Sequence, residues 1–222
     1  LVRLMKNENL KEKYDQVFSA GSEKFFSVNY FNEAHTIVGM GEWQNKAVLD
    51  VGCGEGVLCS MAAHAGASRV VGIDYSSEAI ANANKKFNMD NLEFYAGDHK
   101  EINEKFDVIT MEGVMEHFDS PWDELKDMLD NRLNENGYLI TSSPSFLNPR
   151  GYVWMTLLKL FDVPMSLTDI HYICPFDMKN FCEENGYNLE YKSIYQDWGS
   201  GSGMIGDFNK RLRNALRDAN MD

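Results

Sequence analysis

The stretch that most constrains the fold is VLDVGCGEG, residues 48–56. Ala47–Val51 is a short run that is apolar apart from Asp50, and this pattern predicts a buried β-strand. Three glycines follow at alternate positions, and an apolar run of helical length begins at Val57. A strand, a glycine turn and a helix in this order present free backbone N–H groups at a helix N-terminus. The stretch therefore predicts a site for an anionic or strongly polar ligand.

The spacing of the glycines excludes two common classes of nucleotide site. A dinucleotide fingerprint needs Gly-x-Gly-x-x-Gly, and its third glycine would stand at position 57, where this chain has Val57. A P-loop needs Gly-Lys followed by Ser or Thr, and the turn does not end in that sequence. The pattern that is present is Asp-x-Gly-x-Gly-x-Gly, from Asp50 to Gly56.

Two acidic residues stand where the next strands are predicted to end. Arg69–Asp74 predicts a second strand, and Asp74 follows the glycine turn by about twenty residues, where a carboxylate accepts hydrogen bonds from ribose hydroxyls. Ser76 is suited to cap the next helix, which leaves Asp74 for a ligand. Residues 92–99 predict a third strand that ends in Gly97-Asp98.

Four motifs in order, over residues 46–142, resemble those of the class I S-adenosylmethionine-dependent methyltransferases. The fourth motif is the predicted strand Phe106–Met111 with EGVMEHF after it, and it is similar to that of the ubiquinone-biosynthesis O-methyltransferases and related small-molecule enzymes. The resemblance implies S-adenosylmethionine as cofactor and S-adenosylhomocysteine as product, with Asp74 and Asp98 bracketing one adenosine. The cofactor contacts expected on this basis are Asp50, Gly52, Cys53, Gly54, Gly56, Asp74, Tyr75, Gly97, Asp98, His99, Met111 and Glu112.

The same subgroup has a Glu-x-x-Glu-His sequence that has been associated with a divalent metal. Gly113 stands here at the first Glu position, although Glu112 is adjacent. Glu116 and His117 alone form a small ligand set, so we expect no metal site.

The alternation of strands and helices predicts an α/β fold, a doubly wound and mostly parallel sheet of the Rossmann-like type. A helix is expected to begin at Ser120-Pro121 and to close at Asn136-Gly137, before a fifth strand, Tyr138–Ser142. We expect a single methyltransferase domain with a helical lid over residues 1–45, a cofactor-binding core over 46–143, a helical cap over 144–186, and the last strand or strands with a C-terminal helix over 187–222. The first segment serves either as packing across one end of the sheet or as a lid over the ligand.

The second half of the chain does not continue the regular alternation of strands and helices. Residues 148–161 predict an inserted helix above the carboxyl edge of the sheet, and Pro175–Asn185 predicts another that Gly186 stops. Tyr187–Trp198 alternates in a way that predicts a sixth strand, and Ile205–Arg217 predicts a basic terminal helix.

Composition bounds the partners and the compartment. The 222 residues suit one α/β domain, and the net charge of −13 argues against nucleic acid as a partner. The four cysteines form no Cys-x-x-Cys pair, which favours free thiols in a reducing compartment. The sequence has no apolar stretch of membrane-spanning length and does not open on a signal peptide, so we expect a cytoplasmic monomer or homodimer that does not bind membranes.

The acceptor implied by the resemblance is a small molecule, and an oxygen is favoured over a nitrogen. Of the five histidines, His117 and His171 are the two placed to face an acceptor, and we expect His171, in the cap, to be the catalytic base. The competing interpretation is that His171 packs within the cap. Two other functions stay open: a protein or RNA methyltransferase, and a domain that binds the cofactor without turnover.

Overall fold

The computed structural model describes residues 10–21, 30–147, 149–161 and 169–193, together with residues 205, 206, 209, 210, 212, 213 and 216. These residues fall into two compact units. The larger unit comprises the described residues of Glu8–Val114 and Trp122–Ser142, and the smaller unit comprises those of Met115–Pro121 and Ser143–Asp222.

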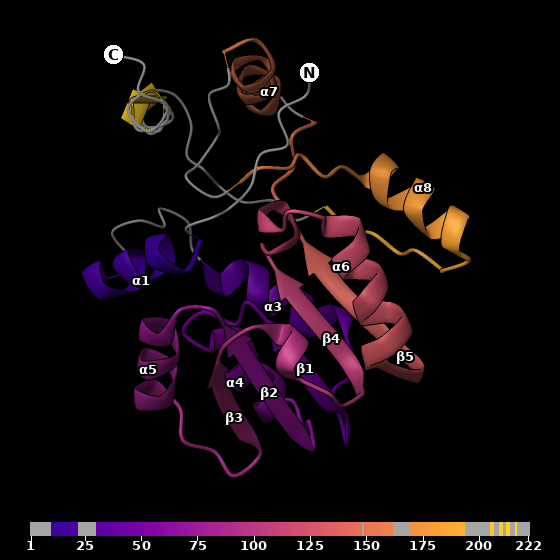
Figure 1. Cartoon of the computed structure of the whole chain (residues 1–222). Coiled ribbons are helices and arrows are strands. Elements are labelled where there is room, and N and C mark those ends of the chain that lie inside the picture. Colours follow the sequence, from indigo (N-terminus) through magenta and orange to yellow (C-terminus); the bar gives the residue numbers. More distant parts are fainter. Residues whose placement is uncertain are drawn as a thin grey trace. The chain divides into compact units, whose positions relative to one another are not determined.

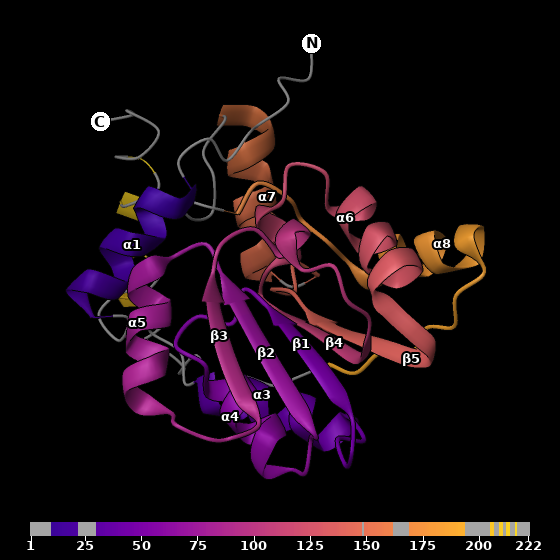
Figure 2. The same cartoon turned by 60° about the horizontal axis from the view of Figure 1, so that its bottom comes forward.

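A five-stranded parallel sheet forms the centre of the larger unit (Figure 2). Its strands are β1 (Ala47–Val51), β2 (Arg69–Asp74), β3 (Leu92–Ala96), β4 (Phe106–Glu112) and β5 (Leu133–Ser142), in the spatial order β3-β2-β1-β4-β5. All four pairings are parallel, which confirms the predicted doubly wound sheet. The strand order reverses between β1 and β4, and ligands of open α/β sheets bind at such a switch point, outside the carboxyl ends of the strands.

Apolar side chains fill both faces of the sheet, as a parallel sheet requires. One face carries Val48, Val70 and Val108, which pack with residues of α3 (Tyr30–Met40) and α4 (Val57–His64). Strand alternation turns Leu49, Val71 and Ile109 to the opposite face, and they too are fully buried. The remaining helices that belong wholly or mainly to this unit are α1 (Leu10–Ala20), α5 (Ser77–Lys86) and α6 (Pro121–Asp127) (Figure 1).

The helix ends near the glycine turn follow their sequence signals. The Ser76 hydroxyl accepts a hydrogen bond from the Ala79 N–H and caps α5, as predicted. Gly66 has a φ of 98° just beyond α4, in the left-handed region where glycine is favoured. The predicted cap at Ser76 is thus confirmed, and Gly66 supplies the left-handed residue that follows the end of α4.

The boundary between α6 and β5 differs from the prediction. The α-helix ends at Asp127, a π-helical turn covers Met128–Arg132, and β5 begins at Leu133, so Asn136-Gly137 lies inside the strand. The pairing shifts register between Phe106, opposite Leu133, and Val108, opposite Tyr138. Asn136 has a φ of 63°, so the turn signal at Asn136-Gly137 marks a bulge in a longer strand instead of the end of a helix.

The smaller unit contains a short helical turn, Met115–His117, and the helices α7 (Pro149–Phe161) and α8 (Pro175–Asn185). Trp154 on α7 is almost fully buried, and its carbonyl accepts a hydrogen bond from the Tyr172 hydroxyl at 3.2 Å. The Tyr172 ring meets Phe146 edge-on, with ring centroids 4.2 Å apart. Gly186 has a φ of 76° at the end of α8 and confirms the predicted stop.

The predicted sixth strand is wrong over residues 187–193, which are described and contain no strand. Their side chains are largely exposed, and Tyr191 is 74% exposed, so the alternation seen in the sequence does not have a buried face to serve. Residues 194–198 of that prediction lie outside the described residues. In the predicted terminal helix, each described position between 205 and 216 is helical, and the rest lies outside the described residues.

The predicted N-terminal helices are present as α1 and α3. Within the described residues, no helix is both long and apolar enough to cross a membrane.

Candidate functional site

The carboxyl ends of the strands and the glycine turn lie at one edge of the sheet in the larger unit. Gly52, Gly54 and Gly56 all have positive φ, between 51° and 79°. A Cβ at Gly52 would lie 2.5 Å from Cγ2 of Val114, so the turn leaves no room for a side chain there. Gly54 is different, because among the described residues a Cβ there would meet only the Phe18 ring of α1, at 3.6 Å. Helix α1 therefore covers the middle of the turn.

Asp74, at the end of β2, holds the glycine turn. Its carboxylate accepts hydrogen bonds from the Gly54 N–H at 2.9 Å and from the Ser76 N–H at 2.8 Å. The backbone of Cys53 is fixed in turn by its N–H, which donates to the Ile73 carbonyl. Gly97 N–H donates to the Asp74 carbonyl and joins the end of β3 to that of β2. The predicted contacts Asp74, Cys53, Gly54 and Gly97 thus lie in one connected loop system.

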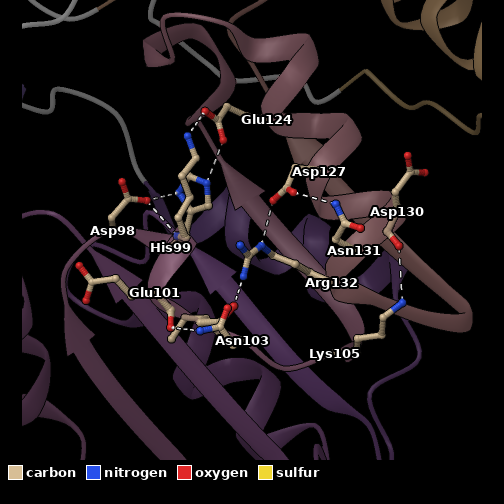
Figure 3. A network of polar contacts seen from close by, with 12 residues as sticks. Asp98, His99, Glu101, Asn103, Lys105, Glu124, Asp127, Asp130, Asn131 and Arg132 are labelled. Atoms are coloured by element: carbon tan, nitrogen blue, oxygen red, sulfur yellow. Dashed lines mark hydrogen bonds and ion pairs between the residues drawn. The ribbon is translucent and has the colours of Figure 1, made fainter.

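Asp98 begins the short turn after β3 and accepts a hydrogen bond from the Lys100 N–H at 2.9 Å. Behind it, His99 is buried and bonds Glu124 of α6 through Nε2 at 3.0 Å, with Nδ1 3.4 Å from Asp98 (Figure 3). His99 therefore ties Asp98 to α6. Tyr75 is half-buried, and burial and then the nearby Asp98 carboxylate raise the pKa of its phenol.

Asp50, the first residue of the glycine motif, is satisfied inside the protein. It is 2% exposed and accepts hydrogen bonds from the Thr110 hydroxyl at 2.6 Å and the Cys59 thiol at 3.0 Å. Burial raises its pKa to about 6 despite these bonds. The structure therefore gives this carboxylate a role in holding β1, β4 and α4 together, and its predicted contact with the cofactor stays a prediction.

Met111 and Glu112 end β4, beside β1. Met111 is fully buried in the strand, and its carbonyl accepts a hydrogen bond from the Thr141 hydroxyl, so its predicted contact with the cofactor stays a prediction. Glu112 carries a buried Oε1 that has no hydrogen-bond partner among the described residues. Burial, followed by Glu33 of α3 and by Asp50, raises its pKa to about 9.

The two predicted catalytic histidines come together in the smaller unit. The carbonyl of Glu116 accepts hydrogen bonds from the backbone N–H groups of Ile170, at 2.9 Å, and His171, at 3.2 Å. His117 Nδ1 lies 3.3 Å from Oδ1 of Asp169. The segment at 169–171 therefore docks on the short turn that holds Glu116 and His117.

Both carboxyl groups of this cluster are largely buried. Glu116 is 2% exposed and accepts a hydrogen bond from the Ser143 hydroxyl at 3.1 Å. Burial is the main cause that raises the pKa of Glu116 to about 7, with Asp169 adding to the rise and His117 opposing it. His171 Nε2 is buried and has no hydrogen-bond partner within the described chain.

Glu116, His117 and Asp169 offer three ligand atoms that all lie within 4.8 Å of one another. Carboxylate oxygens and an imidazole nitrogen suit a divalent cation, so the donor chemistry fits a metal. The same side chains are also held by Ser143 and by the His117–Asp169 contact, which explain the cluster without an ion. The expectation of no metal stays a prediction, now with Asp169 as a third donor that the sequence motif lacked.

Sequence reasoning missed three residues at these sites: Glu33, Phe18 and Asp169. Each lies on a segment with no motif of its own, and each reaches its place through tertiary packing. A weak signal existed for Phe18, because the aromatic spacing of the N-terminal segment is helical.

Comparisons with known proteins find similarity to methyltransferases. A family model described as a methyltransferase domain matches residues 43–204. A ribosomal protein L11 methyltransferase from Lactobacillus johnsonii is 39% identical over 105 residues, which cover 46% of this chain and 32% of that protein. A mitochondrial ubiquinone biosynthesis O-methyltransferase from Schizosaccharomyces pombe is 30% identical over 172 residues, which cover 70% of this chain and 62% of that protein. This chain thus matches about a third of the length of the first relative and about three fifths of the second.

A solved structure is similar over a larger share of both chains. It is a chain from a Haloferax volcanii complex that contains the Trm112 methyltransferase activator, with a TM-score of 0.69, 16% identity and 93% of each chain covered. Likeness at this identity shows a shared fold.

Proposed function

Because the chain belongs to the methyltransferase domain family of S-adenosylmethionine-dependent enzymes, we propose that it methylates a small molecule and that the accepting atom is an oxygen. The acceptor oxygen forms a bond to the methyl carbon while the bond from that carbon to sulfur breaks, and S-adenosylhomocysteine leaves. The protein contributes alignment of the oxygen with the methyl group, and a base that takes the proton of the hydroxyl.

The cofactor site is supported by the larger unit alone. Asp74 ends β2 and Asp98 follows the neighbouring strand β3 at the same edge of the sheet, where the two carboxylates suit the ribose hydroxyls and the exocyclic amine of one adenosine. The left-handed backbone at Gly54, with a φ of 51°, favours glycine and leaves the main chain of the turn without a side chain at this position. The Phe18 ring of α1 lies over that position and supports the lid interpretation of the N-terminal helix.

The observation that carries the choice of an oxygen acceptor is the state of His171. Its backbone is fixed by a hydrogen bond to Glu116, while its Nε2 is buried and unpartnered among the described residues. An unpaired ring nitrogen on a segment whose backbone is fixed is suited to accept a proton from an acceptor hydroxyl. A neutral amine acceptor would not need such a base.

The second candidate is a protein acceptor. It is favoured by the 39% identity to the L11 methyltransferase, which is higher than the identity to the ubiquinone enzyme. Against it, that match covers 46% of this chain, and the ubiquinone enzyme matches 70%. The net charge of −13 opposes RNA as a third acceptor class.

The test is to supply S-adenosylmethionine with a labelled methyl group to the full chain, together with either a small-molecule extract or a ribosomal protein fraction. We expect label in an extracted compound whose mass rises by one methyl group, and in no protein band. Label in a protein band would overturn the proposal in favour of the second candidate. Cofactor binding without label in either fraction would indicate a domain without turnover.

The same assay tests the expected absence of a metal. We expect turnover to survive treatment with a chelator. Loss of turnover that Mg²⁺ or Zn²⁺ restores would show instead that Glu116, His117 and Asp169 hold an ion.

A further inference from the structure

Two thiols from different elements converge beside β2. Cys53 belongs to the glycine turn, and Cys59 lies in the first turn of α4. A Cβ at Gly72 would lie 2.8 Å from Sγ of Cys59 and 2.9 Å from Sγ of Cys53, so both sulfurs approach one point on this strand. Each thiol is also among the groups that act on the pKa of the other. Because Gly72 has no side chain, the two sulfurs share the space beside it.

A carboxylate beside this pair can accept a proton. Asp50 accepts a hydrogen bond from the Cys59 thiol through Oδ2 at 3.0 Å, and from the Thr110 hydroxyl through Oδ1 at 2.6 Å. Burial raises the pKa of Asp50 to about 6, which still leaves it mainly ionised near pH 7. A thiol reacts as its thiolate, so a carboxylate in this position can take the proton of Cys59 when that sulfur reacts.

The two thiols differ in their access to solvent. Cys53 is 8% exposed and Cys59 is 1% exposed, so an oxidant from solvent reaches Cys53 first. A second thiol nearby can then convert an oxidised cysteine into a disulfide. Burial raises the pKa of both thiols, so the pair reacts slowly and is expected to be reduced under ordinary conditions.

We propose that Cys53 and Cys59 form a modification site, at which a peroxide produces a reversible disulfide that switches off cofactor binding. Disulfides in a reducing compartment are typically transient and redox-sensing, which agrees with the free thiols expected for this chain. The effect on binding rests on the proposed function, since it assumes the same cofactor. The formation of the disulfide does not depend on that cofactor.

The reaction balances with one peroxide for each disulfide. Sγ of Cys53 takes one oxygen as the O–O bond breaks, which leaves a sulfenic acid and releases one water. Sγ of Cys59 then attacks that sulfur, and its proton passes to Asp50. The S–S bond forms, the S–O bond breaks, and the leaving hydroxide takes the proton from Asp50 and departs as a second water. The two thiols lose two electrons in total, and the peroxide gains them.

The disulfide changes the turn at two points. Cys53 directly precedes Gly54, whose N–H donates to the Asp74 carboxylate at 2.9 Å, so a displacement of Cys53 toward α4 disturbs this hydrogen bond. The oxidised Cys59 also has no proton to donate to Asp50, which loses one of its two side-chain donors. The turn therefore loses contacts on both sides, and we expect it to bind the cofactor weakly.

The experiment treats the full chain with excess hydrogen peroxide at pH 7 and removes the excess with catalase. Binding of S-adenosylhomocysteine is measured by calorimetry before treatment, after treatment, and after reduction with dithiothreitol. Both cysteines lie in one tryptic peptide, residues 47–69, which is weighed by mass spectrometry without reductant. We expect this peptide to lose the mass of two hydrogens and the affinity to fall by about tenfold or more, with both changes reversed by dithiothreitol. A sulfoxide at Met61 adds the mass of one oxygen and is distinguished in this way.

The test variant is Cys59→Ser, which keeps a hydroxyl that can donate to Asp50 and removes the second sulfur. Its reduced form should bind S-adenosylhomocysteine as the wild type does, and peroxide should not remove two hydrogens from its peptide. The matched control is Cys182→Ser, at a buried thiol of the smaller unit, and it should behave as wild type in both measurements. Circular dichroism checks that both variants are folded.

Four results would overturn the inference: a wild-type peptide 47–69 that keeps both thiols after treatment, oxygen added to Cys53 in place of a disulfide, a link from Cys53 to Cys174 or Cys182, or a Cys53–Cys59 disulfide with unchanged affinity. Each of these leaves the proposed function standing. If the untreated wild type does not bind S-adenosylhomocysteine, the proposed cofactor fails, and the effect on binding fails with it. The mass of the peptide still decides whether the disulfide forms.

Discussion

The strand-end carboxylates of the larger unit and the histidine cluster of the smaller unit are held in opposite ways. Asp74 is fixed by two backbone N–H groups and Asp98 by one, so rigid main-chain donors position these side chains. Glu116, His117 and Asp169 are instead held mainly by side chains and by burial, which raises the pKa of Glu116 to about 7. The first arrangement is suited to binding a fixed ligand, and the second to exchanging protons near neutral pH.

The largest effect is expected on the rate of methyl transfer, from substitution of His171 in the smaller unit. His171→Gln and His171→Ala should each lower the rate of methyl transfer by about 10²–10⁴-fold, because the acceptor hydroxyl loses its base. Cofactor affinity, measured separately by calorimetry, should be retained. His64→Gln is the control, since His64 Nδ1 bonds the Ser60 carbonyl within its own helix. Turnover within a few-fold of wild type in both His171 variants would make this residue structural.

A smaller loss is expected at Asp74. Asp74→Ala removes an acceptor for ribose hydroxyls and for the Gly54 N–H, and should weaken S-adenosylmethionine binding by about 1–3 kcal/mol. Asp107→Asn is a matched control, because Asp107 also accepts a backbone N–H, from Ala47, at the start of β1. Calorimetry on both variants decides the assignment. Unchanged affinity in folded Asp74→Ala would remove this residue from the site.

The smallest effect is a change in the pH dependence of stability, and it concerns Glu112. This residue lies in the larger unit, yet its carboxyl group is expected to titrate, as that of Glu116 does in the smaller unit. Its folded-state pKa of about 9 is above the ordinary value of 4.5, so its contribution to stability is full below pH 4.5 and is lost as pH rises through 9. In the ligand-free protein the free energy of unfolding should fall by up to about 1.4 kcal/mol per pH unit from this group. Urea unfolding at pH 7, 8 and 9 should show a flatter dependence in Glu112→Gln. Parallel curves for the two proteins would contradict the assignment.

The parts of the molecule that were predictable from sequence are those in which one local pattern determines one local structure. The glycine turn, the strand-end positions of Asp74 and Asp98, and the cap at Ser76 each follow from a few adjacent residues. The parallel sheet then follows from the alternation of elements, since parallel strands need helical crossovers.

The parts that could not be predicted depend on contacts between distant segments or on a signal with two meanings. Asp169 contacts His117 although α6, β5 and α7 lie between the two residues in the sequence. Nothing near Asp169 in the sequence indicates that contact. Glu33 acts on Glu112 from a helix that carries no motif. Asn136-Gly137 is a turn signal that also suits a bulge, and only the pairing of β5 with β4 decides between the two.

The four free cysteines are distributed evenly between the two units, with Cys53 and Cys59 in the larger and Cys174 and Cys182 in the smaller. Burial raises the pKa of Cys53 to about 11 and raises that of Cys59 as well, and only a thiolate reacts readily with an alkylating reagent. Alkylation of these two residues therefore requires the glycine turn and α4 to open first. Mass spectrometry of alkylated peptides can thus time the opening of the larger unit through Cys53 and Cys59, and that of the smaller unit through buried Cys182.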